Sequence, residues 1–235
     1  MRLDKFLGDM GQGGRADLKK LIRAGNVLVN GEVVRDSGCQ VQTADDVVLS
    51  GRRIPYHETE YFMMNKPAGV LTATEDKKQQ TVLDLLTGIH RTDLFPVGRL
   101  DKDAEGLLLI TNDGALAHRL LAPKSHVDKI YAVTVSGIPD ERDCRAFERG
   151  IQIGEDILTE PAGLEIVSVS EGSGTSETRV TIHEGKFHQI KKMFAARGME
   201  VLYLKRLAMG ILVLDEPLQP GQFRSLTEEE LEGLL

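Results

Sequence analysis

The chain has 235 residues, of which 41% are hydrophobic and 28% charged, and its formal net charge is −7. This length suits one large domain or two unequal ones, and no apolar run approaches the ~20 residues of a membrane-spanning helix. The residues after Met1 lack the apolar stretch of a signal peptide, and Cys39 and Cys144 stand far apart without metal-ligand spacing. We therefore expect a reduced, cytoplasmic protein without a membrane partner.

The first 58 residues are predicted to form a small α+β domain that ends in a linker. A short helix at residues 3–7 is followed by a glycine-rich break, and a second helix covers residues 16–24 and ends at Gly25. The outward face of this second helix carries three cations, Lys19, Lys20 and Arg23. Such a stripe suits RNA phosphates, but a solvated helix face has the same pattern. Asn30-Gly31 between two Val-rich arms predicts a β-hairpin.

From residue 59 to residue 235 the pattern changes to strands separated by helices. The predicted strands cover residues 61–64, 107–111, 130–136, 164–169, 178–183, 201–204 and 211–214. The predicted helices cover residues 81–86, 115–121, 141–150 and 189–197. Long alternating strands favour a mixed, largely antiparallel central sheet flanked by helices. The predicted fold class is therefore α+β, with a small domain followed by a larger one.

The negative net charge hides two basic segments. Residues 1–35 carry seven Lys or Arg against four acids, and residues 183–206 carry six against two. Basic patches on an acidic body are typical of a protein that holds a polyanion at chosen places. Solvated helix faces would give the same charges, so the pattern leaves both interpretations open.

The run Gly98–Gly106 is dense in charge and leads directly into an apolar strand. It places Asp101 between Arg99 and Lys102, and charged groups are costly to bury unless they are paired. The run imitates a calcium loop, but its twelfth position is Asn112 rather than glutamate. A phosphatase nucleophile would follow an apolar strand, whereas this aspartate precedes one. We favour Asp101 as an ionised nucleophile or charge stabiliser that cations hold in place.

A second basic cluster spans Glu184–Met193, between a predicted strand and a predicted helix. A nearby lysine would keep the carboxylate of Asp101 ionised despite burial, and Lys191 is the first candidate, with Lys192 next. On a helix these two side chains point about 100° apart, so we expect one of them to face the site. An ordinary salt bridge between two elements is the competing explanation.

Five motifs, in order, resemble those of pseudouridine synthases, and most closely the ribosomal small-subunit branch, the RsuA family. They are Asn65–Gly69, Gly98–Asp101 with Gly106–Gly114, Lys129–Tyr131, Glu184–Met193, and Pro220-Gly221 before Leu226–Glu230. The N-terminal part resembles the S4-like RNA-binding domain that precedes these enzymes. The resemblance implies an S4-like domain at residues 1–58 and a catalytic domain at residues 59–235, with an active-site cleft across a mixed sheet.

The resemblance also implies an activity, the isomerisation of one uridine in RNA to pseudouridine. By position, Asp101 is the essential aspartate, and Lys191 is its basic partner, where many relatives have arginine. Tyr131 covers the target base, and Arg99 helps to turn the nucleotide out of its stack. An isomerisation changes no oxidation state and needs no activated donor, so we expect no cofactor and no metal.

The expected partner is ribosomal RNA, or a partly assembled ribosomal subunit, bound by a monomer. We favour small-subunit (16S) rRNA; large-subunit (23S) rRNA and a non-catalytic RNA-binding or ribosome-assembly factor are the alternatives. The predicted RNA-binding residues are Lys19, Lys20, Arg23, Lys102, His188, Gln189 and Lys192. For His188 and Gln189, bracing of their own loop is an equal alternative.

Overall fold

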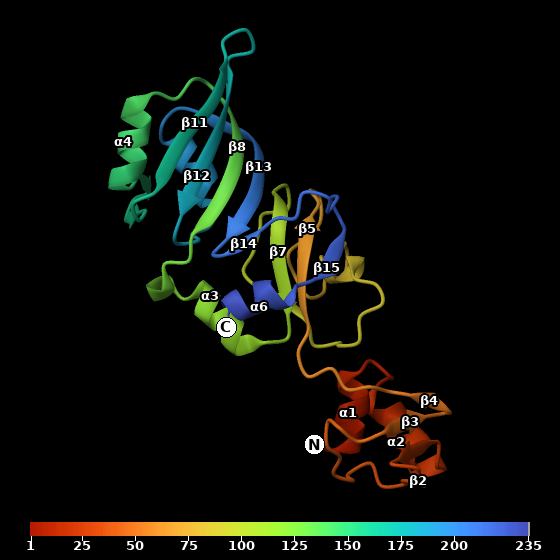
Figure 1. The fold of residues 1–235 in the computed structure, drawn as a ribbon. Coiled ribbons are helices and arrows are strands. Elements are labelled where there is room, and N and C mark those ends of the chain that lie inside the picture. The colour runs from red at the N-terminus through yellow and green to blue at the C-terminus, as the bar shows by residue number, and fades with distance from the viewer. Residues whose placement is uncertain (235) are drawn as a thin grey trace. The chain divides into compact units, whose positions relative to one another are not determined.

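The computed structural model describes residues 1–234 (Figure 1). They divide into two compact units: Met1–Glu60 with Leu86–Phe95, and Tyr61–Leu85 with the residues from Pro96 onward. The sequence predicted a single boundary after residue 58, whereas the chain here leaves the first unit after Glu60 and returns to it for ten residues. Among the described residues, no helix has the length and apolarity needed to cross a membrane.

The first unit combines two helices with a small sheet. Its elements are α1 (Leu3–Asp9), α2 (Arg15–Ala24), β1 (Val27–Val29), β2 (Glu32–Val33), β3 (Val47–Leu49) and β4 (Arg52–Arg53). The strands are antiparallel in the order β2-β1-β3-β4. Helix α2 ends at Gly25, whose φ of 82° forms a left-handed cap. The predicted hairpin is confirmed, because Asn30 and Gly31 both have positive φ between paired β1 and β2.

The second unit is built on a nine-stranded sheet. Its strands are β5 (Tyr61–Lys66), β6 (Phe95–Pro96), β7 (Glu105–Thr111), β8 (Lys129–Ser136), β11 (Gly163–Ser170), β12 (Thr175–Ile182), β13 (Glu200–Met209), β14 (Leu212–Val213) and β15 (Phe223–Ser225). The main path runs β11-β12-β8-β13-β7-β5-β15, with β14 beside β13 and β6 beside β7. Strand β13 is parallel to β7, and the other pairs on this path are antiparallel. The predicted mixed, largely antiparallel sheet is therefore confirmed.

Helices and short turns connect these strands. They are η1 (Leu83–Leu85), α3 (Gly114–Leu121), η2 (Pro123–Ser125), α4 (Glu141–Arg149), α5 (Gln189–Ala195) and α6 (Glu228–Leu234), and a two-stranded ribbon adds β9 (Gln152–Gly154) and β10 (Ile157–Leu158). The helix predicted at residues 81–86 is wrong, since only a 3-10 turn forms there. The Asp84 side chain accepts hydrogen bonds from the backbone N–H and hydroxyl of Thr81, an alternative to helical backbone pairing.

The core of the second unit lies on one face of the β8–β12–β13 region. Tyr131, Val133 and Val135 alternate along β8 and are all buried in one hydrophobic cluster. Helices α4 and α5 contribute Phe147 and Phe194 to the same cluster, with ring centroids 5.1 Å apart; α4 packs on β11 (Figure 1). Tyr131 is thus fixed by the sheet and the core, although it also lines a pocket.

Gly106 marks the closest approach of β7 to β13. Its φ is 103°, and a Cβ atom would collide with the backbone carbonyl of Arg206. We expect Gly106→Ala to lower the free energy of unfolding by about 3 kcal/mol or more, because the strained backbone and the clash add. Urea denaturation measures this loss. The control is Gly114→Ala, where nothing lies within 4 Å and the change should stay below about 1 kcal/mol; equal losses would contradict the argument.

Candidate active site

The loop that carries Asp101 is tied down on both sides. The Thr72 hydroxyl donates to the Leu100 carbonyl at 2.8 Å, and the Leu100 N–H points back to the same hydroxyl at 3.3 Å. The N–H of Gly69 donates to the Lys102 carbonyl at 2.8 Å. Leu100 is itself buried. Asp101 therefore sits on a short, fixed segment, as a group that must meet a substrate in one geometry requires.

Lys66, at the end of β5, anchors the other side of this loop. Its side chain is fully buried, and its ammonium donates to the carbonyls of Pro67, Lys102 and Ala104 at 3.0, 3.2 and 2.8 Å. Burial lowers the pKa of Lys66 to about 8, against the attraction of nearby carboxylates. Three carbonyls use all three ammonium donors. Lys66 is thus a positioning residue for the loop.

A lysine and a histidine reach Asp101 from α5 and the residue before it. The Lys191 ammonium lies 3.4 Å from one carboxylate oxygen, and the His188 Nε2 atom lies 3.5 Å from the other. The Asp101 side chain is 25% exposed, and so is that of Lys191. The two predicted halves of the site, far apart in sequence, therefore meet in space within the second unit.

Lys191 makes its shorter contacts with a different carboxylate. Its ammonium lies 2.6 and 2.8 Å from the two oxygens of Asp103, which is exposed. The hydrogen bond from Lys191 is the main cause of the lowered pKa of Asp103. Burial works against the charge of Lys191, but its hydrogen bond to Asp103 and the charge of Asp101 outweigh burial and raise its pKa. Lys191 thus remains a cation shared by two carboxylates.

Three adjoining pockets open around this ion pair. Arg99 lines all three, Asp101 lines two, and Tyr131 separates the smallest from a cavity of about 350 Å³. The largest of the three has about 480 Å³ and is lined by both Arg99 and Asp101. Arg99 is exposed and makes no hydrogen bond or ion pair within residues 1–234. An exposed guanidinium, a carboxylate and an aromatic wall therefore face one hollow in the second unit.

The loop before α5 is held by a buried polar network. The Gln189 amide donates to Glu184 at 2.9 Å and accepts from the Lys186 N–H at 2.9 Å, and Lys186 also pairs with Glu184. Gln189 is 4% exposed, so its amide is already engaged in bracing the loop. His188 has a positive φ of 52°. Phe187 is 71% exposed, and its ring stacks on that of His188.

The remaining predicted RNA contacts are on accessible surfaces. Lys192 lies over the ring of Phe187, 5.1 Å from its centroid, whereas the neighbouring Lys191 is the lysine that pairs with Asp101. The exposed Lys102 bonds Gln79 at 2.6 Å. In the first unit, the three predicted cations Lys19, Lys20 and Arg23 are all exposed on α2. Lys20 makes a 3.1 Å exposed pair with Asp17, which contributes little in water and leaves the cation available to a phosphate.

Sequence reasoning missed two buried cations beside Tyr131. Arg206 is 2% exposed; its Nε donates to the Leu107 carbonyl at 2.7 Å, while its Nη2 has no partner within residues 1–234. Lys129 is also buried, and both line the 350 Å³ cavity beyond Tyr131. Burial, followed by the charge of Arg206, lowers the pKa of Lys129. Two buried positive charges suit a bound anion. The sequence offered one indication of this pair: Lys129 lies two residues before Tyr131 and so on the same face of the strand.

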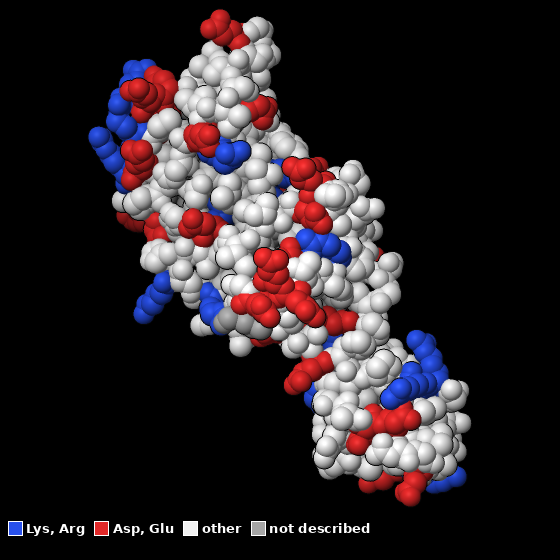
Figure 2. All heavy atoms as spheres, viewed as in Figure 1, with Lys and Arg blue, Asp and Glu red and all other residues white. Residues whose placement is uncertain are grey.

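Charge on the surface is otherwise mixed. Figure 2 shows acidic side chains gathered over α6, whose first turn contains Glu228, Glu229 and Glu230. The positive charge of the site therefore comes from the few cations that line the pockets, not from a broad basic surface. The site thus has a fixed carboxylate between cations and beside an aromatic ring. Such a carboxylate can act as a nucleophile or stabilise charge on a planar group that is attached to a polyanion.

The matching family models decide the family. Residues 60–196 match the RNA pseudouridylate synthase family, and residues 1–48 match the S4 domain. The chain belongs to the RNA pseudouridylate synthase family. The synthase model covers more than half of the chain and includes Asp101, Tyr131 and Lys191. The synthase thus has the predicted order of an S4 domain followed by a catalytic domain.

Relatives that align over the full length of the synthase are named for different ribosomal subunits. It is 49% identical over 98% of its length, and 97% of the relative, to an uncharacterized RNA pseudouridine synthase of Bacillus subtilis. It is 42% identical over 100% of its length, and 99% of the relative, to ribosomal small subunit pseudouridine synthase A of Vibrio cholerae. It is 39% identical over 99% of its length, and 95% of the relative, to ribosomal large subunit pseudouridine synthase B of Bacillus subtilis.

A solved structure has the same fold over both chains. The crystal structure of a pseudouridylate synthase superposes with a TM-score of 0.69 and 36% identity, and it covers 100% of each chain. The α+β architecture of the synthase, with its mixed central sheet, is therefore that of a known pseudouridylate synthase.

Replacing Lys191 tests the cation beside Asp101. We expect Lys191→Met to lower the single-turnover rate of pseudouridine formation by about 10²-fold, because a fixed charge is lost near Asp101, the carboxylate predicted to react. Lys191→Arg should retain most of the rate, since it keeps the charge. The matched control is the neighbouring Lys192→Met, which should weaken RNA binding but leave the chemical step unchanged. Equal rates for the two Met variants would contradict this role.

Proposed function

We propose that the synthase isomerises one uridine of ribosomal RNA to pseudouridine, and that its substrate is small-subunit rRNA. The pocket around Asp101 carries the proposal for the chemistry, since it joins a carboxylate, two cations and an aromatic wall. The relatives named for ribosomal subunits support rRNA as the substrate class. The higher identity to the small-subunit relative, 42% against 39%, supports that subunit. An rRNA substrate supports a location in the cytoplasm.

The proposed reaction replaces one bond to the sugar by another. The bond between ribose carbon 1′ and uracil nitrogen 1 breaks, the base turns, and a bond from carbon 1′ to carbon 5 forms. The proton on carbon 5 leaves and nitrogen 1 gains one, so atoms and charges balance without an oxidant. The carboxylate of Asp101 acts on the sugar or base during the exchange, and Lys191 with His188 holds it in place.

The target base has to leave its RNA stack to reach Asp101. Flipping a nucleotide costs a few kcal/mol, and Arg99, which reaches all three pockets, is placed to brace the gap. Stacking on Tyr131 returns about 1–3 kcal/mol. The cavity with Lys129 and Arg206 lies on the other side of Tyr131 and offers charge to an RNA phosphate. The exposed cations of α2 give the S4 domain its own phosphate contacts.

Pseudouridine mapping tests this proposal. Small-subunit rRNA, large-subunit rRNA and partly assembled particles that lack the modification are incubated with the protein, then mapped by carbodiimide labelling and primer extension. One new stop in small-subunit rRNA, absent with Asp101→Asn, is the expected result. A stop in large-subunit rRNA would overturn the choice of subunit but keep the chemistry. No stop in any substrate would favour a non-catalytic RNA-binding factor.

A further inference from the structure

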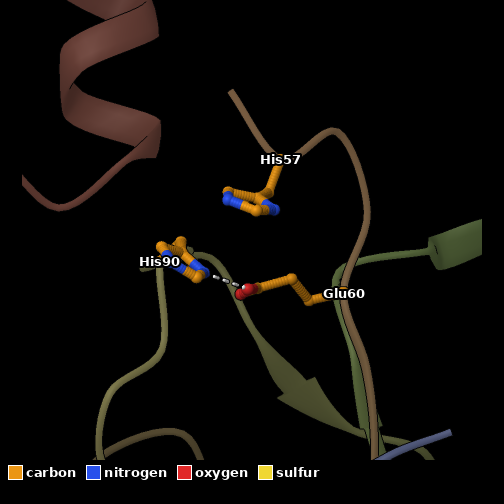
Figure 3. Close-up of side chains that lie close together, drawn as sticks. All are labelled: His57, Glu60 and His90. Carbon is orange, nitrogen blue, oxygen red and sulfur yellow. Dashed lines mark hydrogen bonds and ion pairs between the residues drawn. The ribbon is translucent and has the colours of Figure 1, made fainter. Parts of the chain in front are cut away.

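Two histidines and a glutamate meet in the first unit, outside the pockets described above (Figure 3). His57 and Glu60 belong to the segment before β5, and His90 belongs to the returning segment Leu86–Phe95. One imidazole nitrogen from each histidine and one carboxylate oxygen all lie within 4.8 Å of one another. We propose that these three side chains bind a divalent transition-metal ion of the zinc class.

The distances are close to those of a zinc site. The Nδ1 atom of His90 lies 2.8 Å from the Oε1 atom of Glu60. Ligands at 2.0–2.2 Å from zinc stand about 3.3 Å apart in a tetrahedron, so this pair needs only a small adjustment. The nitrogen of His57 is within 4.8 Å of both other ligand atoms. Rotation of the His57 side chain would shorten these distances to those of a zinc site.

The position of the His57 ring supports metal binding over a simple hydrogen bond. The hydrogen bond between Glu60 and His90 explains why these two side chains are close, but it does not explain the position of His57. The His57 ring stacks on that of His90, with centroids 3.9 Å apart and planes 17° from parallel, and Figure 3 shows the carboxylate beside both rings. A histidine ligates a metal through an unprotonated ring nitrogen, so Zn²⁺ would bind here in competition with protons.

Arg91 holds the three ligands together from behind. Its backbone N–H donates to the Glu60 Oε2 atom at 3.0 Å, which leaves Oε1 directed toward the histidines. Its guanidinium donates to the His57 carbonyl at 3.0 Å and pairs with Asp93. Arg91 is 4% exposed, so this support is fixed by packing. Hydrogen bonds that orient ligands in this way are a regular part of metal sites.

The donor set and the surroundings fit zinc more than a hard cation. Two imidazoles and one carboxylate suit zinc and its neighbours, while magnesium and calcium prefer oxygen ligands. Three protein ligands leave a fourth position for water. The Glu60 side chain is 10% exposed and that of His90 is 49% exposed, so the ion has an entry path. The Glu60 carboxylate offers negative charge to a bound dication, and Asp93 balances the charge of Arg91.

A bound ion would fasten two stretches of chain to each other. His57 and Glu60 precede the point where the chain enters the second unit, and His90 lies between its exit and re-entry. Cross-linking these stretches would stabilise the first unit, because an ion that binds only the folded state adds to its stability.

Zinc titration of the full chain tests the proposal. Metal-free protein is titrated with Zn²⁺ in a calorimeter and in competition with a chromophoric chelator, and Co²⁺ provides a visible absorption readout. We expect about one Zn²⁺ per chain, a raised thermal midpoint that EDTA reverses, and no comparable effect of Mg²⁺. None of these readouts depends on pseudouridine formation.

Variants locate the site. His57→Gln and His90→Gln should each weaken Zn²⁺ binding by about tenfold or more, and His118→Gln, at an exposed position on α3, should leave binding unchanged. Far-ultraviolet circular dichroism and the metal-free thermal midpoint check that each variant is folded. Wild-type protein that binds no Zn²⁺, or folded His57 and His90 variants that bind it as well as wild type, would overturn the proposal.

Discussion

Asp101→Asn is expected to lower the rate of pseudouridine formation by about 10³-fold or more while the protein stays folded and binds RNA. The substitution keeps the size of the side chain but removes its charge and its capacity to act as a nucleophile. The tied loop around Asp101 should stay in place, because Thr72, Gly69 and Lys66 hold it through backbone groups. Single-turnover kinetics with saturating enzyme separates the chemical step from RNA binding.

Asp103→Asn is the matched control for this prediction. Asp103 is two residues away, is bound by the same lysine and is 72% exposed, against 25% for Asp101. Its loss frees Lys191 but removes no reacting group, so we expect a decrease of about tenfold or less. A larger loss for Asp103→Asn than for Asp101→Asn would mean that the wrong carboxylate has been assigned.

Lys66→Met is expected to cause the largest loss of stability among the site substitutions, about 3 kcal/mol or more. It removes the donor from three backbone carbonyls, of which the Ala104 carbonyl is in a fully buried bond, and each unsatisfied buried acceptor costs about 1–3 kcal/mol. Because two of these carbonyls flank Asp103 in the active-site loop, activity should fall as well. Urea denaturation measures the stability, with the exposed Lys77→Met as the control. A Lys66 variant as stable as that control would contradict the positioning role.

The pH dependence of the same variant checks the burial of the charge. The pKa of Lys66 is about 8 in the folded protein and about 10.4 in an unfolded chain. Between these values the unfolded chain binds more protons at this group, so the free energy of unfolding rises with pH. The stability difference between wild type and Lys66→Met should therefore grow from pH 8 to pH 10, by about 3 kcal/mol at most. A difference independent of pH would contradict a buried ammonium.

The sequence predicted the parts of the site that depend on local chemistry. The charged loop at Asp101 follows from the cost of burying charge, and the direction of Lys191 relative to Lys192 follows from helix geometry. The Asn30-Gly31 hairpin and the mixed sheet follow from turn chemistry and alternation. Each of these is decided by residues close together in the chain, or by a period that the sequence displays directly.

The features that escaped prediction depend on where distant segments meet. Nothing near Lys191 shows that Asp103, rather than Asp101, receives its shortest hydrogen bonds, because the loop conformation decides which carboxylate it reaches. The return of residues 86–95 to the first unit has no composition signal, and it alone brings His90 to His57. Arg206 lies in an ordinary strand pattern, and only the pairing of β13 with β7 and β8 places it beside Tyr131.

Release of tritium from carbon 5 of uridine tests the central claim most directly. An rRNA transcript labelled with tritium at this carbon loses the label to water only when a new bond forms there. The account predicts release of about one tritium per modified site with wild-type protein, and none above background with Asp101→Asn at the same degree of RNA binding. Equal release by the two proteins, or none by wild type on any ribosomal RNA or particle, would contradict catalysis by Asp101.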